Sequence, residues 1–263
     1  MVIATLRRDS RFLGVSALVF AASAAITIVR CACMSPMGGM SMPGGWTMSM
    51  VWMTMSGQTW FHAAASFLGM WILMMVAMML PSLVPILWRY RQAITGTSVT
   101  RLGWLTALVG TGYFFVWTVF GMAVFPLGVA LASIEMQRPM VASAVPIAIG
   151  MVVLIAGALQ FTAWKTHHLA GCRDAPGRGR PYLPGPGTAW RDGLRLGAHC
   201  IHCCVGLTAV LLVIGVMDLR VMSVVAAATT AERLATDGQR TARAIGAVLV
   251  GAGLLLTARA AWL

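Results

Sequence analysis

One short segment gathers much of the chain's capacity to bind a metal. Residues 199–204 read HCIHCC, which places three of the six cysteines and two of the five histidines within six positions. On a helix, Cys200, Cys203 and Cys204 lie at positions i, i+3 and i+4 and therefore share one face. Clusters of cysteine and histidine usually bind transition metals. The alternative is that these cysteines are small apolar residues buried in a helix, but three on one face favour the metal.

Further ligands are needed, because one helix rarely completes a tetrahedral site. His199 borders the thiol face, whereas His202 points nearly to the opposite side of the helix. The segment LQFTAWKTHHLAGC, residues 159–172, ends a predicted helix and supplies three more donors: His167, His168 and Cys172. The last two are favoured as ligands. The first is equally compatible with a solvated helix end.

Methionine is concentrated in two places. Residues 31–55 form a predicted external loop with eight methionines, among them Met34, Met37, Met40 and Met42. On the predicted helix that follows, Met74 and Met78 lie on one stripe. Soft thioethers select Cu(I), so both groups are candidate copper ligands. The alternative is that methionine serves as apolar filler in a loop and in an irregular core.

Composition and hydropathy place the chain in a membrane. It has 263 residues, of which 59% are hydrophobic and 10% charged, whereas soluble domains carry about 25% charged residues. A transmembrane helix needs about 20 apolar residues, and suitable runs lie near 12–29, 61–88, 102–134, 140–164, 194–217 and 243–262, with a shorter run at 219–232. We predict a single all-α polytopic helical bundle, residues 1–263, with about seven transmembrane helices and six as the alternative. Closely spaced glycine and proline argue against a barrel.

Lysine and arginine set the expected orientation, since cytoplasmic loops carry an excess of both. With the N-terminus in the cytoplasm, fifteen of these residues lie inside and four outside. This predicts a bacterial inner-membrane protein with an external C-terminus, and it accounts for the charge of +12 without nucleic acid. A Pro/Gly/Arg-rich cytoplasmic linker, residues 172–193, is expected to separate helices one to four from five to seven. The alternative for the first helix is a signal peptide.

A few residues inside the apolar segments also attract interest. Pro81 and Pro85 are expected to break or kink the second helix. Intramembrane carboxylates are functional candidates. For Asp218 we favour a simple pairing with Arg220, while Glu232 is either a helix-end residue or a group that supports a metal ligand.

Four segments resemble a bacterial family of predicted metal-binding integral membrane proteins, catalogued as domain of unknown function 2182. They are AMMLPS (77–82), QFTAWKTHHLAGC (160–172), CIHCC (200–204) and GVMDLRVM…ERL (215–234). The family pattern has cysteine where this chain has His168, glycine at His202 and tryptophan at Val205. The first change keeps a metal ligand, and the other two leave the geometry of the site open. The resemblance implies a metal-binding membrane protein without naming a reaction.

The sequence therefore predicts an integral membrane protein that handles a transition metal, by transport, delivery or sensing. Copper as Cu(I) is favoured, with zinc and iron as alternatives. The expected partners are membrane lipid, the metal ion and a soluble protein. A membrane oxidoreductase or metal-dependent enzyme subunit working with a soluble partner is the alternative function, and a structural subunit is the third. No nucleotide-binding loop is found, which argues against direct ATP drive.

Overall fold

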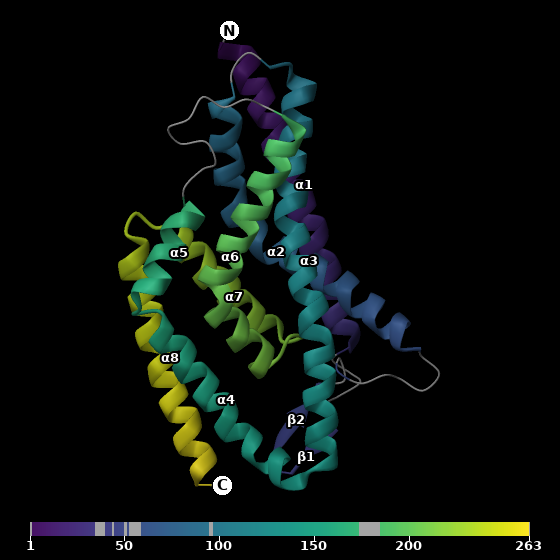
Figure 1. Cartoon of the computed structure of the whole chain (residues 1–263), viewed down its shortest axis with the longest axis vertical. Coiled ribbons are helices and arrows are strands. Elements are labelled where there is room, and N and C mark those ends of the chain that lie inside the picture. Colours follow the sequence, from purple (N-terminus) through teal and green to yellow (C-terminus); the bar gives the residue numbers. More distant parts are fainter. Residues whose placement is uncertain are drawn as a thin grey trace.

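A computed structural model describes residues 2–34, 40–43, 45–49, 52, 59–94, 97–173 and 185–262. Eight helices and one two-stranded sheet follow in the order α1 (Val2–Met34), β1 (Met40–Met42), β2 (Trp46–Met48), α2 (Trp60–Ala93), α3 (Val99–Gln137), α4 (Pro139–Leu159), α5 (Ala163–Arg173), α6 (Pro186–Ile214), α7 (Leu219–Leu234) and α8 (Gly238–Ala261). The predicted all-α bundle is confirmed. Figure 1 shows a long bundle with the two termini at opposite ends.

Six of the described helices are long and apolar enough to cross a membrane: α1, α2, α3, α4, α6 and α8. The predicted seventh segment exists as α7, but it has only 16 residues, or about 24 Å at 1.5 Å per residue. That length falls short of a hydrocarbon core of about 30 Å. By length and composition the count is therefore six, the alternative to the favoured seven, and α7 is a shorter helix with one face buried.

Side chains at the chain's turns explain where several helices begin. Thr59 and Ser98 accept hydrogen bonds from backbone N–H groups at the starts of α2 and α3. Asp218 caps α7 by accepting from the N–H groups of Arg220 and Val221. These caps satisfy amide groups that have no partner within the helix. Asp218 thus contacts Arg220, the expected residue, through the backbone N–H of Arg220 at 2.8 Å.

Two helices differ from the sequence expectation. The prolines of α2 do not end it, because one helix runs from Trp60 to Ala93 through both of them. The predicted fourth helix, in contrast, is divided into α4 and α5 by a turn at residues 160–162. Beyond this break, α5 has Lys165, Leu169 and Cys172 buried.

Glycines allow two pairs of helices to pack at very short range. Between α4 and α8, a Cβ on Gly157 would lie 2.7 Å from the backbone nitrogen of Val250. Between α3 and α6, a Cβ on Gly112 would lie 2.8 Å from the carbonyl oxygen of Trp190. Small residues at such crossings are typical of membrane helices, where close packing replaces the hydrophobic effect as the driving force.

The core and the lipid-facing surface are clearly separated. Large buried side chains, such as Trp71, Tyr113 and Trp117, gather where α2, α3 and α6 meet. Large apolar side chains remain exposed along α1, α3, α4 and α8, as expected for surfaces that contact lipid.

A small hairpin within residues 31–55 was not predicted. Met40 pairs with Met48 and Met42 with Trp46 in an antiparallel register. The indole N–H of Trp46 donates to the carbonyl oxygen of Ala142 at 2.8 Å, which attaches the hairpin to the start of α4. Part of the methionine-rich segment is therefore packed against the bundle.

Candidate metal centre

Four cysteine sulfurs lie together at the centre of the bundle. Cys172 on α5 contacts Cys203 on α6 at 3.2 Å between Sγ atoms. Along α6, Cys203 and Cys204 are 3.4 Å apart, and Cys200 and Cys204 are 3.9 Å apart. All four side chains are at most 2% exposed. The helical spacing of the three α6 cysteines and the turn that redirects α5 together bring the four thiols to one place.

The sulfur spacings are close to those of a metal–thiolate cluster but are not a completed site. A tetrahedral ion with metal–sulfur bonds of about 2.3 Å separates its sulfurs by about 3.8 Å. The Cys200–Cys204 spacing has this value, while the Cys172–Cys203 contact is shorter. Within the described residues no group of three or more His, Cys, Asp or Glu side chains is arranged to hold an ion. Binding would require the thiols to move apart by a few tenths of an ångström.

A buried arginine lies against the thiols. Nη1 of Arg233 on α7 donates to the hydroxyl of Ser82 at 2.8 Å and lies 3.5 Å from the sulfur of Cys200. The hydroxyl of Tyr113 on α3 donates to the same sulfur at 2.8 Å and is 3.4 Å from the arginine. The thiol of Cys200 is therefore surrounded by hydrogen-bond donors, an environment that favours a negatively charged sulfur.

Among the described residues, no carboxylate balances the charge of Arg233. Its side chain is 4% exposed, and within the described residues its Nε and Nη2 atoms have no hydrogen-bond partner. The carboxylate of the preceding residue, Glu232, is already bound to Lys165 at 2.6 Å and to Gln160 at 2.9 Å. A buried charge without a counterion is costly. The arginine is consequently placed to stabilise a negative charge on the thiols.

The pair formed by Lys165 and Glu232 supports the thiols from the other side. The ammonium of Lys165 also donates to the carbonyl oxygen of Cys203 at 2.6 Å. Burial acts to lower the pKa of Lys165, but the charge and hydrogen bond of Glu232, together with Cys203 and Cys204, outweigh it, and the pKa is raised above its usual value. The charged ammonium thus holds the backbone of α6 at the cysteine cluster, and Glu232 is the buried partner of that ammonium.

The histidines form a group of their own. His168 lies beside His202, His167 and His199, with ring centroids 4.8, 5.3 and 6.0 Å away. Burial and the three neighbouring imidazoles lower the pKa of His168, which favours the neutral form that binds metals. The structure therefore brings Cys172 to the α6 thiols, whereas it places His168, His167 and His199 beside His202, outside the thiol group.

Two of the predicted methionines line a cavity of about 340 Å³ between α1, α2 and α7. Met74 and Met78 contribute thioethers from α2, and Met222 contributes a third from α7. Met40 and Met42 lie in the hairpin, Met37 lies outside the described residues, and for Met34 only the backbone is described. At the end of α1, the thiol of Cys31 is 3.9 Å from the sulfur of Met217.

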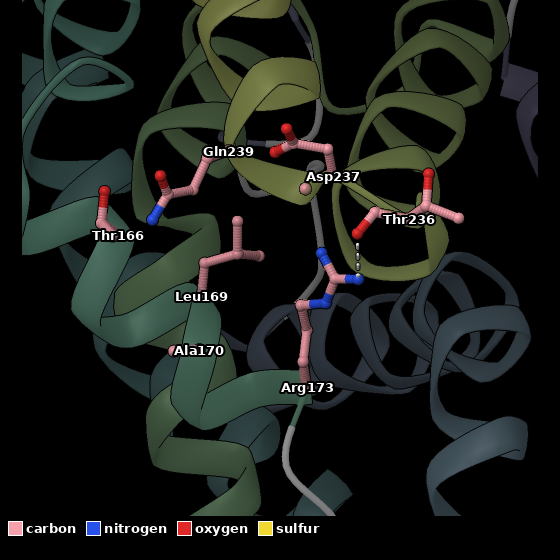
Figure 2. A pocket seen from close by; sticks show the side chains of 8 residues that line it. Thr166, Leu169, Ala170, Arg173, Thr236, Asp237 and Gln239 are labelled. Atoms are coloured by element: carbon pink, nitrogen blue, oxygen red, sulfur yellow. Dashed lines mark hydrogen bonds between the residues drawn. The ribbon is translucent and has the colours of Figure 1, made fainter.

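A second cavity, of about 470 Å³, lies on another face of α5. Figure 2 shows Leu169 projecting into it, Gln239 reaching toward Thr166 and Arg173 extending to Thr236. Its lining contains neither the thiols nor the imidazoles. It is a polar hollow between α5 and the start of α8, separate from the candidate metal centre.

The sequence interpretation missed three residues of the centre: Lys165, Arg233 and Tyr113. The charge count placed Lys165 and Arg233 in the cytoplasmic loops, yet both are buried. The same is true of Arg91, which lies outside the centre. Tyr113 was not considered at all. Their position inside apolar segments was the available signal, because charged residues within a bundle usually have a structural or functional partner.

Residues 68–256, which include all of these centre residues, match the PpoB2 family, described as a copper chaperone. The chain belongs to this family of copper chaperones. The expectation of a metal-binding family is confirmed, and the description names copper. Comparison with curated proteins and with solved structures gave no match. Together with the six apolar helices, the family shows a copper-handling protein with the features of a membrane protein.

Proposed function

We propose that the chain binds Cu(I) at the four-thiol centre inside the membrane and delivers it to a soluble partner protein. The observation that carries this proposal is the contact between four buried thiols and an arginine whose charge has no carboxylate partner among the described residues. Thiolates are preferred ligands of Cu(I). The ligands we assign are Cys172, Cys200, Cys203 and Cys204.

Charge balance supports a monovalent ion in this centre. A Cu(I) ion held by two thiolates, with the other two cysteines as neutral thiols, has a net charge of −1, which one arginine neutralises. Zn(II) held by four thiolates would carry −2 and leave one charge unbalanced in a low-dielectric interior. Arg233 thus favours the copper complex over zinc with the complete thiol set. Copper passing through such a site changes ligands without changing its oxidation state.

Methionine sulfurs suggest a path toward the thiols. We place the first contacts at the methionine-rich segment that includes Met34, Met37, Met40 and Met42, and the next at the cavity lined by Met74, Met78 and Met222. Thioethers bind Cu(I) more weakly than thiolates, since they are neutral, so the ion gains affinity when it passes from the methionines to the thiols. Such a gradient favours movement from the loop to the centre.

We further propose a bacterial inner membrane as the location, with the N-terminus in the cytoplasm and the C-terminus outside. Six spans alone would bring the C-terminus back to the cytoplasm, so this orientation requires α7 to return the chain across the membrane, although it is shorter than the other spans. The charge asymmetry among the loops supports this orientation even without the three buried cations. Reporter domains fused within residues 174–184 and after residue 263 should then be found on opposite sides of the membrane. Reporters on the same side would exclude this topology.

The central experiment measures Cu(I) bound per purified protein under anaerobic conditions, in competition with a chromophoric Cu(I) chelator. Replacing Cys203 or Cys204 by serine should each reduce bound copper well below the wild-type ratio, because a hydroxyl is a poor ligand for a soft ion. The double variant should be little worse than either single one, since ligands of one site are not additive.

Cys33→Ser is the matched control, because this cysteine is exposed at the end of α1 and distant in sequence from the centre. It should retain the wild-type copper ratio. Full copper binding by the Cys203 and Cys204 variants, with their folds intact by circular dichroism, would refute the thiol centre.

A further inference from the structure

Four of the five histidines of the chain meet on one side of α5 and α6. His168 is at the middle of the group, and its ring stacks on that of His202 at an interplanar angle of 17°. The indole of Trp164 covers the edge of His168 at 4.7 Å. Four imidazoles gathered from two helices supply enough nitrogen donors for a complete metal site.

Two of the rings have nitrogen atoms available for a ligand. Nδ1 of His168 is buried, and within the described residues it has no hydrogen-bond partner. Nδ1 of His202 lies 2.7 Å from the carbonyl oxygen of Ala198. A carbonyl only accepts, so this nitrogen carries the proton, and Nε2 of the neutral ring keeps its lone pair. A backbone carbonyl that orients one ring nitrogen is the usual support for a histidine that binds metal through the other.

The backbone also makes room for a third ring. A Cβ on Gly171 would lie 2.9 Å from Nδ1 of His199. The absence of a side chain there lets the imidazole from α6 approach α5 beside His168. The imidazole of His199 can therefore occupy this position only because residue 171 of the neighbouring helix is glycine.

We infer that His167, His168, His199 and His202 form a second copper site, separate from the four thiols. The stacked rings of His168 and His202 do not converge on one point as they lie, so binding requires one of them to rotate. His202 is exposed and has space to do so. This inference rests on the proposed function, because it assigns the imidazoles as the position from which copper enters or leaves the thiol centre.

The two donor groups are adjacent on the same helices. On α5, His168 and Cys172 are four residues apart, and on α6 His199 directly precedes Cys200. Copper can therefore exchange ligands without leaving the α5–α6 interface. In that step Cu–N bonds break and Cu–S bonds form, the ion remains Cu(I), and a freed imidazole accepts the proton released by a thiol. No electron is transferred and no additional reactant is needed.

X-ray absorption of the full chain, loaded anaerobically with one and then two equivalents of Cu(I), tests the inference. The first equivalent should show sulfur ligands, and the second should add nitrogen ligands with the outer-shell scattering of imidazole. His168→Ala and His202→Ala should each lose the second equivalent and keep the first. Gly171→Ala should weaken the second equivalent by displacing His199.

His62→Ala is the control, since this remaining histidine lies at the exposed start of α2. It should keep both equivalents. Saturation at one equivalent, or an imidazole signal that survives in the His168→Ala/His202→Ala double variant, would overturn the second site. If the first equivalent bound by the wild-type protein showed no sulfur ligands, the thiol centre would be contradicted instead. The two failures are therefore distinguishable.

Discussion

The ammonium of Lys165 lies 2.6 Å from the carboxylate of Glu232, and the two side chains are only 4% and 1% exposed. This ion pair joins α5 to α7 and holds Cys203 through its carbonyl oxygen. Because Glu232 is bound to Lys165, it does not pair with the adjacent Arg233, whose guanidinium contacts the thiol of Cys200 instead. One buried pair thus determines both the position of α5 and the electrostatic environment of the metal centre.

Glu232→Gln should destabilise the protein, because it leaves the ammonium of Lys165 buried without a counterion. Breaking a buried pair by removing one partner typically costs about 3–5 kcal/mol. We expect a clear decrease in the free energy of unfolding, measured by denaturant titration in detergent micelles. Adding Lys165→Met should recover much of the loss, since it removes the unpaired charge.

The exposed ion pair between Asp237 and Arg240 is the control for Glu232. Its side chains are 49% and 87% exposed, and surface pairs contribute about 0–1 kcal/mol. Arg240→Ala should therefore have little effect on unfolding. Equal losses in the Glu232 and Arg240 variants would show that the buried pair is not the stronger link.

Arg233→Met should separate stability from copper binding. Replacing a buried unpaired charge by an apolar side chain of similar length should leave the copper-free protein as stable as wild type, or more so. Its affinity for Cu(I) should fall by about tenfold or more, a loss of at least about 1.4 kcal/mol, because the thiolate complex loses its counter-charge. Chelator competition measures the affinity and thermal denaturation the stability.

Arg233→Lys keeps the charge and should retain most of the affinity, although it loses the planar set of donors. If the copper-free Arg233→Met protein unfolds easily while its copper affinity is unchanged, the arginine has a purely structural role.

The sequence allowed much of the thiol centre to be predicted, because helical periodicity alone places three α6 cysteines on one face. It did not allow the separation of His168 from Cys172, although both belong to one short helix. That separation depends on the direction of α5, which follows from the turn at residues 160–162 and from the Lys165–Glu232 pair. Local periodicity carries no information on such a contact between distant segments.

The buried charges were hidden for a related reason. Arg233 ends α7 in the sequence, where a cytoplasmic positive charge is expected by the usual topology rule. Only the contact of α7 with α2 and α6 shows that this residue points into the bundle. A composition rule applied to loops cannot distinguish a cation at a membrane surface from one that stabilises a site.

Gly157→Ala and Gly251→Ala should have opposite effects, although both replace a helical glycine by alanine. A Cβ on Gly157 would lie 2.7 Å from the backbone nitrogen of Val250 and 2.9 Å from the carbonyl oxygen of Gly246, whereas one on Gly251 meets nothing within 4 Å. Alanine favours helices over glycine by about 1 kcal/mol. We therefore expect Gly251→Ala to be neutral or stabilising and Gly157→Ala to be destabilising.

Thermal denaturation in one detergent provides the comparison for both glycine variants. A stable Gly157→Ala protein would mean that α4 and α8 can move apart at no cost, and their close packing would then not be required for the fold.

Replacing Met74, Met78 and Met222 together by leucine should slow the loading of copper without reducing the amount bound at equilibrium. Leucine preserves most of the apolar volume, and such swaps usually cost less than about 1.5 kcal/mol each, but it removes the thioethers that line the cavity between α1, α2 and α7. The measurement is the rate of Cu(I) uptake into vesicles containing the protein, together with the final copper ratio. Met151→Leu is the control, because that methionine is exposed on α4 and should leave the rate unchanged. A triple variant that loads as quickly as wild type would remove the cavity from the path, and copper would then reach the thiols without these three methionines.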